Sequence, residues 1–241
     1  MSIDTVVLDI EGTICPISYV KEILFPYFVA KLPSCLDSIE FPLDKASNDL
    51  VVKTLTQLSP DITTSAKSTF DYLKKLVDND VKDPVLKSLQ GLVWKQGYLS
   101  GELKSPIYKD SIEFIQDFPN TSQKKIYIYS SGSINAQKLL FSHVDNGDNT
   151  IDLNPQLSGY FDITTAGFKQ EPCSYSKIIE KINKRGKQSS ILFLSDNINE
   201  VKAAIQAGMQ SFIVVRDGNA PIPENELSSH KVIHSLAQLD L

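Results

Sequence analysis

The stretch VVLDIEGTIC at residues 6–15 decides the fold, because it ends an almost uninterrupted apolar run with two acids and a glycine. A short apolar run without alternation is typical of a strand buried on both faces of a parallel sheet, so residues 4–9 predict such a strand. Gly12 then lets the chain leave the strand tightly. The question is what chemistry needs Asp9 and Glu11 at this strand end.

From residue 105 onward, apolar strands alternate with helical segments. The expected elements are helices at 109–117, 134–143, 174–183 and 198–208, a polar loop at 145–158, and strands at 124–131, 190–196 and 211–216. Such alternation predicts a parallel α/β sheet. The strand at 4–9 must join it, since a lone strand buries nothing. The predicted fold class is therefore α/β, with a Rossmann-like parallel-sheet core at 1–16 and 105–241.

Residues 17–104 contain no convincing strand. Apolar residues recur at helical spacing in YVKEILFPYFVAKL, with Pro26 as a kink, and again at positions 70, 73, 76 and 77. A third helix is expected to begin near Pro84 and continue to Leu103. The block at 17–104 is therefore predicted to be an all-helical domain inserted after the first strand.

Composition excludes several classes of protein. The chain has 241 residues, 41% of them hydrophobic, and a net charge of −5 with only two arginines, which argues against a nucleic-acid partner. We expect no secretory signal, and no apolar run approaches the roughly 18 residues of a membrane span. Three dispersed cysteines are too few for a disulfide framework. We expect a cytoplasmic protein, with the nucleus as a further compartment, no membrane partner, and a monomer.

Chemistry-bearing residues follow each strand. Asp9 and Glu11 end the first strand, Ser130–Ser133 end the second, and Asp196 ends the third, while Lys169 precedes a helix. Ligands bind beyond the carboxyl ends of parallel strands, so these groups should share one edge. Converging carboxylates repel unless a cation lies among them, and oxygen-only ligands favour Mg²⁺. The lysine and hydroxyls would meet an anion, and phosphate is the natural one.

In this order, DIEGT, YSSGS, the isolated lysine and LFLSD resemble the four motifs of the haloacid dehalogenase superfamily of aspartate-nucleophile phosphatases. The chain is especially similar to the enolase-phosphatase branch of methionine salvage, which has Glu in DIEGT, YIYSSGS…AQKLLF, FLSD followed four residues later by Glu, and VVRxGNA. The resemblance covers residues 5–16 and about 105–220, and the block at 17–104 resembles the cap domain in position and character. Asp217 departs from it, because proline is expected there.

The resemblance implies a Mg²⁺-dependent phosphatase with one metal ion per subunit. Asp9 is expected to attack phosphorus and form an aspartyl-phosphate, while Glu11 protonates the leaving oxygen and later deprotonates water. Mg²⁺ would be held by Asp9, Asp196 and the backbone carbonyl of Glu11.

Ser130, Ser131 and Lys169 are the expected substrate-binding residues. The substrate implied by the resemblance is the small phosphate ester 2,3-diketo-5-methylthiopentyl-1-phosphate, which is enolised and then dephosphorylated to an acireductone. The alternative within the superfamily is a phosphatase of another small phosphorylated metabolite.

Simpler interpretations stay open at this point. Asp9 and Glu11 could merely end a strand, and Asp196 could merely cap the helix that follows it. Glu200 is expected to be a supporting or helix-surface acid rather than a metal ligand. Two other functions fit less well: a dehalogenase does not need Glu11, and a signalling receiver domain places its acid pair and acceptor aspartate in the opposite strand order.

Overall fold

The computed structural model describes residues 2–120 and 124–241, and the chain divides into two compact units. One unit consists of Met1–Tyr19 together with Lys104–Leu241, and the other is Val20–Leu103. The second unit therefore interrupts the first in the sequence, directly after the segment that carries the first strand. No helix in the described parts of the chain has the length and apolarity to cross a membrane.

The first unit is built on a six-stranded sheet in which every pairing is parallel. In spatial order the strands are β5 (Gly159–Phe161), β2 (Lys125–Tyr129), β1 (Thr5–Leu8), β6 (Ile191–Ser195), β7 (Gln210–Val214) and β8 (Val232–Ile233). A separate hairpin pairs β3 (Val144–Asp145) with β4 (Thr150–Ile151). The predicted α/β class with a parallel sheet is confirmed.

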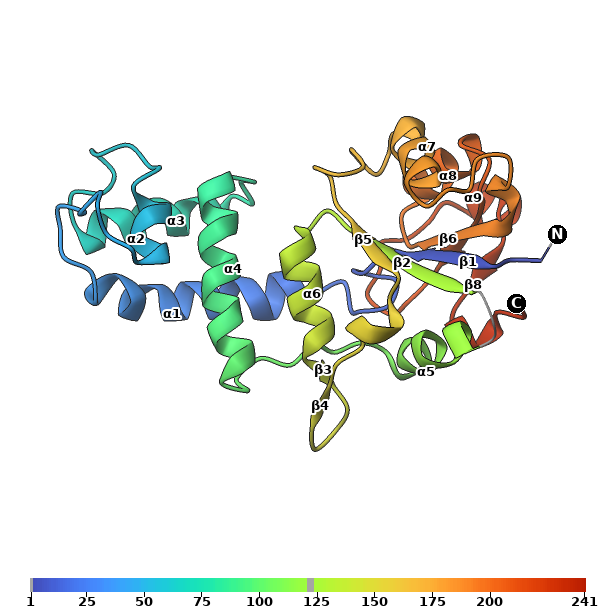
Figure 1. Ribbon diagram of the computed structural model, residues 1–241, viewed down its shortest axis with the longest axis horizontal. Coiled ribbons are helices and arrows are strands. Elements are labelled where there is room, and N and C mark those ends of the chain that lie inside the picture. The colour runs from blue at the N-terminus through green and yellow to red at the C-terminus, as the bar shows by residue number, and fades with distance from the viewer. Residues whose placement is uncertain (1, 121–123) are drawn as a thin grey trace. The chain divides into compact units, whose positions relative to one another are not determined.

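Helices cover both faces of this sheet. Figure 1 shows α7 (Pro172–Lys181) and α8 (Ile198–Gln206) on one face and α5 (Lys109–Asp117) on the other. The helices α6 (Ile134–Ser142) and α9 (Glu224–Ser229) complete the unit. Every residue of β1 is buried, which explains its unbroken apolar sequence. On the α7–α8 face, Val7 and Phe193 pack in one cluster with Tyr175 and Ala203.

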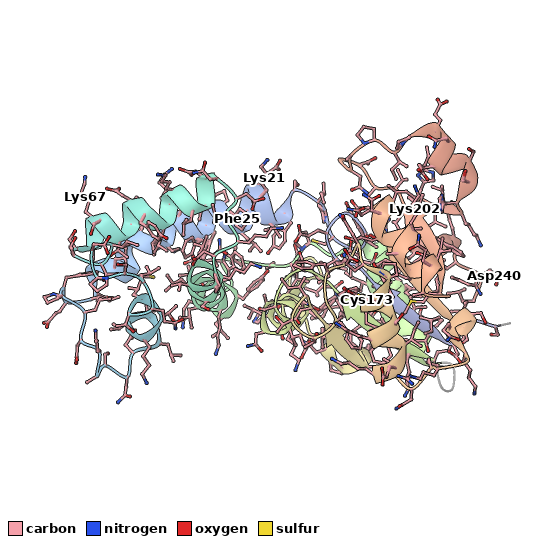
Figure 2. All side chains as sticks on the ribbon, turned by 90° about the horizontal axis from the view of Figure 1, so that it is seen from above. Lys21, Phe25, Lys67, Cys173, Lys202 and Asp240 are labelled. Carbon is pink, nitrogen blue, oxygen red and sulfur yellow. The ribbon has the colours of Figure 1, made fainter. Side chains whose placement is uncertain are left out.

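The second unit is entirely helical in its regular structure. It contains α1 (Phe25–Asp37), α2 (Leu50–Leu55), α3 (Ala66–Asp78) and α4 (Pro84–Leu99), and Figure 2 marks the first turns of α1 and α3 with Phe25 and Lys67. Ser65 is the N-cap residue of α3 and forms a capping box with Ser68. The Ser65 side chain accepts from the Ser68 N–H, and the Ser68 hydroxyl accepts from the Ser65 N–H. A cluster of buried Leu, Val and Phe side chains forms a hydrophobic core within this second unit.

The predicted elements match the observed ones except in short or irregular segments. Helices α2 and α9, strands β5 and β8 and the β3–β4 hairpin were not predicted, and α4 ends at Leu99 rather than Leu103. Pro26 does not kink one long helix: it lies in the first turn of α1, after a π-helical segment at Tyr19–Leu24. Proline lacks the N–H that the first turn of a helix leaves unpaired, so this position suits it.

The sheet order places the ends of β1, β2 and β6 together. Leu8 is paired with Ile128 on one side and with Leu194 on the other. Asp9 follows directly after this register, and its N–H donates to the Leu194 carbonyl at 3.0 Å. Because β2 and β6 flank β1, the carboxyl end of β1 lies where the connections leave the sheet in opposite directions, which is where ligands bind in open α/β sheets.

Candidate active site

Asp9 is the first residue after β1 and is only 6% exposed. Its Oδ1 accepts from the N–H of Ile10 at 2.7 Å, and its Oδ2 lies 3.3 Å from the Ser195 hydroxyl oxygen. These contacts hold the carboxylate at the end of the strand rather than turned away from the sheet. The structure therefore places Asp9 in a buried, fixed position at the predicted edge.

Lys169 reaches Asp9 from the loop before α7. Its Nζ lies 2.5 Å from Asp9 Oδ1 and 2.7 Å from Glu200 Oε2, and its side chain is 9% exposed. Burial alone would lower the pKa of Lys169, but the charges and hydrogen bonds of Asp9 and Glu200 outweigh it and raise that pKa. Lys169 is therefore a permanent ammonium group held against the Asp9 carboxylate.

Glu200 lies in the first turn of α8, buried beneath this ion pair. Besides Lys169, it accepts from the Ser195 hydroxyl at 2.8 Å, and it is 8% exposed. Burial first, and the charge of Asp9 second, raise its pKa. Of the two roles expected for Glu200, the helix-surface role is wrong. Its place four residues after Asp196, one helical turn further on, is the sequence signal that it faces the sheet.

Asp196 follows β6, and its N–H donates to the Thr13 hydroxyl at 3.1 Å. It does not cap α8: the cap is Asn197, whose side chain accepts from the Asn199 N–H at 3.0 Å. Burial, and then repulsion from the nearby carboxylates, raise the pKa of Asp196 to about 7.

Gly12 makes room for that carboxylate. Its φ is +73°, a conformation that favours glycine, and a Cβ there would collide with the Asp196 carboxylate. Its carbonyl accepts from the Asn219 Nδ2 at 2.9 Å. Asn219 Oδ1 lies 3.1 Å from the position that a Cβ on Gly12 would occupy. This oxygen is buried and has no hydrogen-bond partner in the described chain. Asn219 thus holds the loop that follows β1.

Glu11 lies on this loop and is half-buried. The strand ends at Leu8, so the alternation of side chains along a strand does not by itself place Glu11 on the side of Asp9. Its position beside Asp9 stays a prediction. Cys15, four residues on, is fully buried, and burial raises the pKa of its thiol, so it is an inert core residue.

Arg216 is a residue whose role the sequence did not reveal. Its Nε donates to the Thr13 carbonyl at 3.0 Å, and its Nη2 donates to Asp110 Oδ2 at 2.8 Å. Asp110 lies in the first turn of α5 and also accepts from the Leu236 N–H at 2.7 Å. Arg216 therefore ties the loop after β1 to α5 and the C-terminal segment. It and Asn219 both belong to VVRDGNA, the stretch already noted for its family likeness.

The serines after β2 lie at the same edge of the sheet by register. Ser130 is buried, its N–H donates to the Phe161 carbonyl at 3.2 Å, and its hydroxyl accepts from the Gly132 N–H at 3.3 Å. Ser131 is exposed. Ser133 caps α6 by accepting from the Ala136 N–H. Ser130 and Ser131 therefore follow a strand end at this edge, and their binding of an anionic substrate stays a prediction.

The charges of this cluster suit a divalent cation. Three carboxylates, those of Asp9, Asp196 and Glu200, lie close to one ammonium group, that of Lys169. The ammonium group pairs with Asp9 and Glu200 and leaves Asp196 without an ion pair in the described chain. Within residues 2–120 and 124–241, no three Asp, Glu, His or Cys side chains form a ready-made metal centre. The donor set implied by the family resemblance is smaller, the two carboxylates of Asp9 and Asp196 with a backbone carbonyl, and it stays a prediction. Such hard oxygen donors fit Mg²⁺.

The parallel α/β unit carries a buried Asp–Lys pair at the end of its first strand, at the sheet edge where the motifs predict the site of a phosphatase. Residues 3–208 match the haloacid dehalogenase-like hydrolase family, and the chain belongs to that family. The family resemblance inferred from the motifs is thus confirmed, and the protein is an enzyme.

Individual proteins are similar to this chain over its whole length. The chain is 66% identical to an enolase-phosphatase E1 of Lodderomyces elongisporus and 60% identical to one of Candida tropicalis, with 100% of both chains covered in each case. Among solved structures, it is similar to the UTR4 protein of Saccharomyces cerevisiae, with a TM-score of 0.85 and 41% identity over 99% of this chain and 100% of that one.

Proposed function

We propose that this enzyme is an enolase-phosphatase that converts 2,3-diketo-5-methylthiopentyl-1-phosphate and water to an acireductone and inorganic phosphate in methionine salvage. Relatives named enolase-phosphatase E1 match the whole chain at high identity. The observation that carries the proposal is the buried carboxylate of Asp9 held 2.5 Å from the Lys169 ammonium. This pair supplies a nucleophile and a positive charge for a phosphoryl group at one point of the sheet edge.

Substrate binding is proposed to use the N–H groups and hydroxyls after β2. Ser130 and Ser131 would hold equatorial phosphoryl oxygens, and Lys169 would balance their charge. Because the phosphoryl group is an anion that repels the carboxylate of Asp9, positioning and charge neutralisation account for most of the rate.

Phosphoryl transfer proceeds in two steps. In the first, an Asp9 carboxylate oxygen forms a bond to phosphorus while the bond between phosphorus and the substrate oxygen breaks, and the Glu11 carboxyl gives its proton to the departing oxygen. In the second, water attacks the phosphorus of the aspartyl-phosphate. The water proton goes to the Glu11 carboxylate, and Asp9 leaves as a free carboxylate, so the enzyme returns to its starting state.

Hydrolases of this family generally use Mg²⁺, and we propose that this chain binds one ion through Asp9, Asp196 and the backbone carbonyl of Glu11. When bound, Mg²⁺ screens the Asp9 carboxylate from the phosphoryl anion and makes the C–H beside a dicarbonyl more acidic. Arg216 and Asn219 hold the loop that contains the Glu11 carbonyl through the carbonyls of Thr13 and Gly12.

Turnover of the diketo-methylthiopentyl phosphate tests the function. Enol and phosphate are followed separately, with Mg²⁺ and after its removal by EDTA. The proposal predicts that enol forms first, that phosphate follows, and that both require Mg²⁺. Phosphate release with no preceding enol, or release undiminished by EDTA, would contradict it.

Two expectations from the sequence stay predictions. One is that residues 17–104 act as a cap domain, and the other is that the enzyme is a cytoplasmic monomer.

A further inference from the structure

The loop that carries Lys169, residues 166–171, begins at the buried Ala166 and then runs to exposed positions, yet it must present a buried ammonium group. Phe168, directly before the lysine, is 71% exposed, and Gly167 has a φ of +117°. Lysine has a long, flexible side chain, so the ion pairs with Asp9 and Glu200 require a fixed backbone beneath it. The question is what fixes this backbone.

Two buried tyrosine hydroxyls bind the loop on both sides of Phe168. The Tyr129 hydroxyl donates to the Gly167 carbonyl at 2.7 Å, and the Tyr175 hydroxyl donates to the Lys169 carbonyl at 2.6 Å. Tyr129 ends β2 and Tyr175 lies on α7, and both are fully buried. The loop is thereby tied to the sheet and to the helix that covers it.

The same two side chains also support each other and the ammonium group. Their rings meet edge to face with centroids 5.5 Å apart, and Lys169 Nζ lies 5.9 Å from the centroid of the Tyr129 ring. Burial raises the pKa of Tyr129 to about 12 and raises the pKa of Tyr175 as well, so both hydroxyls keep their protons. They act as hydrogen-bond donors throughout the neutral range.

Core packing alone does not require these hydroxyls. A phenylalanine ring would fill each position, as Phe193 does next to Tyr175 in the same cluster. A buried hydroxyl, in contrast, costs free energy unless it finds a partner. Here each partner is a backbone carbonyl of the lysine loop, one of them the carbonyl of Lys169 itself.

We propose that Tyr129 and Tyr175 are positioning residues for phosphoryl transfer, which fix the 166–171 loop so that Lys169 meets Asp9 and the substrate phosphoryl group. This inference rests on the proposed function of Lys169. A small displacement of a group that binds the transition state is enough to slow catalysis strongly.

The test is a double-mutant cycle measured by phosphate release. Tyr129→Phe and Tyr175→Phe each remove one hydroxyl and leave the ring, and each is expected to lower kcat/KM about tenfold, the equivalent of one hydrogen bond. In a Lys169→Met background, neither change should lower the residual rate further, because the group that they position is gone. Thermal unfolding verifies that each variant is folded.

Tyr127→Phe is the matched control, since Tyr127 lies on the same strand against the same core cluster and its hydroxyl makes no hydrogen bond in the described chain. It should retain wild-type kcat/KM. If Lys169→Met is impaired but the two Phe variants match wild type, or if they lower the rate equally with and without Lys169, the positioning role is refuted. If Lys169→Met itself is fully active, the failure lies with the proposed function instead.

Discussion

Replacing Asp196 with asparagine in the metal-free enzyme should make the protein more stable at pH 8. The Asp196 carboxylate is half-buried near Asp9 and Glu200, and it has no ion-pair partner in the described chain. Asparagine has nearly the same shape and no charge, so it removes the repulsion while keeping the packing against Gly12. The same substitution removes a proposed Mg²⁺ ligand.

The magnitude follows from the shift in pKa. A rise from 3.8 to about 7 means that ionised Asp196 costs the folded state up to about 4 kcal/mol once the pH exceeds 7. Burying the asparagine amide in the folded state costs about 1–3 kcal/mol, which offsets part of the gain from removing the charge. The folded pKa is higher than the unfolded one, so the stability of the wild type falls as the pH rises from about 4 to about 7. The variant lacks this loss, so it should be about 2 kcal/mol more stable than the wild type at pH 8 and about 2 kcal/mol less stable near pH 4, where only the cost of the buried amide remains.

Thermal unfolding of EDTA-treated protein at pH 4.5 and pH 8 measures this, with and without added Mg²⁺. Asp240→Asn is the control, because Asp240 is exposed and lies at the outer edge of the sheet-containing unit (Figure 2). At pH 8, Asp196→Asn should raise Tm by several degrees, on the order of 2–4 °C per kcal/mol, while Mg²⁺ should stabilise the wild type and not the variant. A variant destabilised equally at both pH values, or one stabilised by Mg²⁺ as strongly as the wild type, would refute the reasoning.

Two further predictions concern the loop after β1. Gly12→Ala combines a strained φ, worth about 1–2 kcal/mol, with a collision at Asp196, so it should lower Tm and abolish the Mg²⁺-dependent rise in Tm; an undiminished rise would contradict this. Asp110→Asn should cost about 1–2 kcal/mol in urea unfolding at pH 6, because Arg216 loses the carboxylate of its ion pair. Hydrogen bonds from Arg216, Ser235 and Leu236 outweigh burial and lower the pKa of Asp110, so this cost should shrink as the pH falls below about 4; a cost independent of pH would show that the charge is irrelevant.

The central strands could be predicted from the sequence because burial on both faces leaves an unbroken apolar run, as in β1 and β6. The edge strands β5 and β8 have three and two residues, too few to show any pattern. Helices α2 and α9, with six residues each, are missed for the same reason. Prediction therefore succeeded for the central strands and failed for elements too short to show a periodic pattern.

Some residues of the candidate site could likewise be predicted from the sequence, and others could not. Asp9, Lys169 and Asp196 were found because each follows or precedes a predicted element, and a parallel sheet brings such positions to one edge. The bond of Arg216 to Asp110 joins residues 106 positions apart and leaves no local signal. Tyr129 and Tyr175 look like ordinary core aromatics in the sequence, since only the folded chain shows where their hydroxyls point.

The central claim is that Asp9 forms a covalent phosphoenzyme that Glu11 helps to hydrolyse, and mass spectrometry of acid-quenched Glu11→Gln enzyme tests it most directly. With the diketo substrate, the leaving oxygen belongs to an enol and depends less on a proton from Glu11, whereas hydrolysis of the aspartyl-phosphate still needs a base. The variant should therefore accumulate a phosphoryl group on the peptide containing Asp9, and accumulate less with a simple alkyl phosphate. Asp9→Asn should show no adduct and release no phosphate. A Glu11→Gln enzyme that carries no phosphoryl group with either substrate would contradict this division of roles, and an adduct on any residue other than Asp9 would contradict the claim itself.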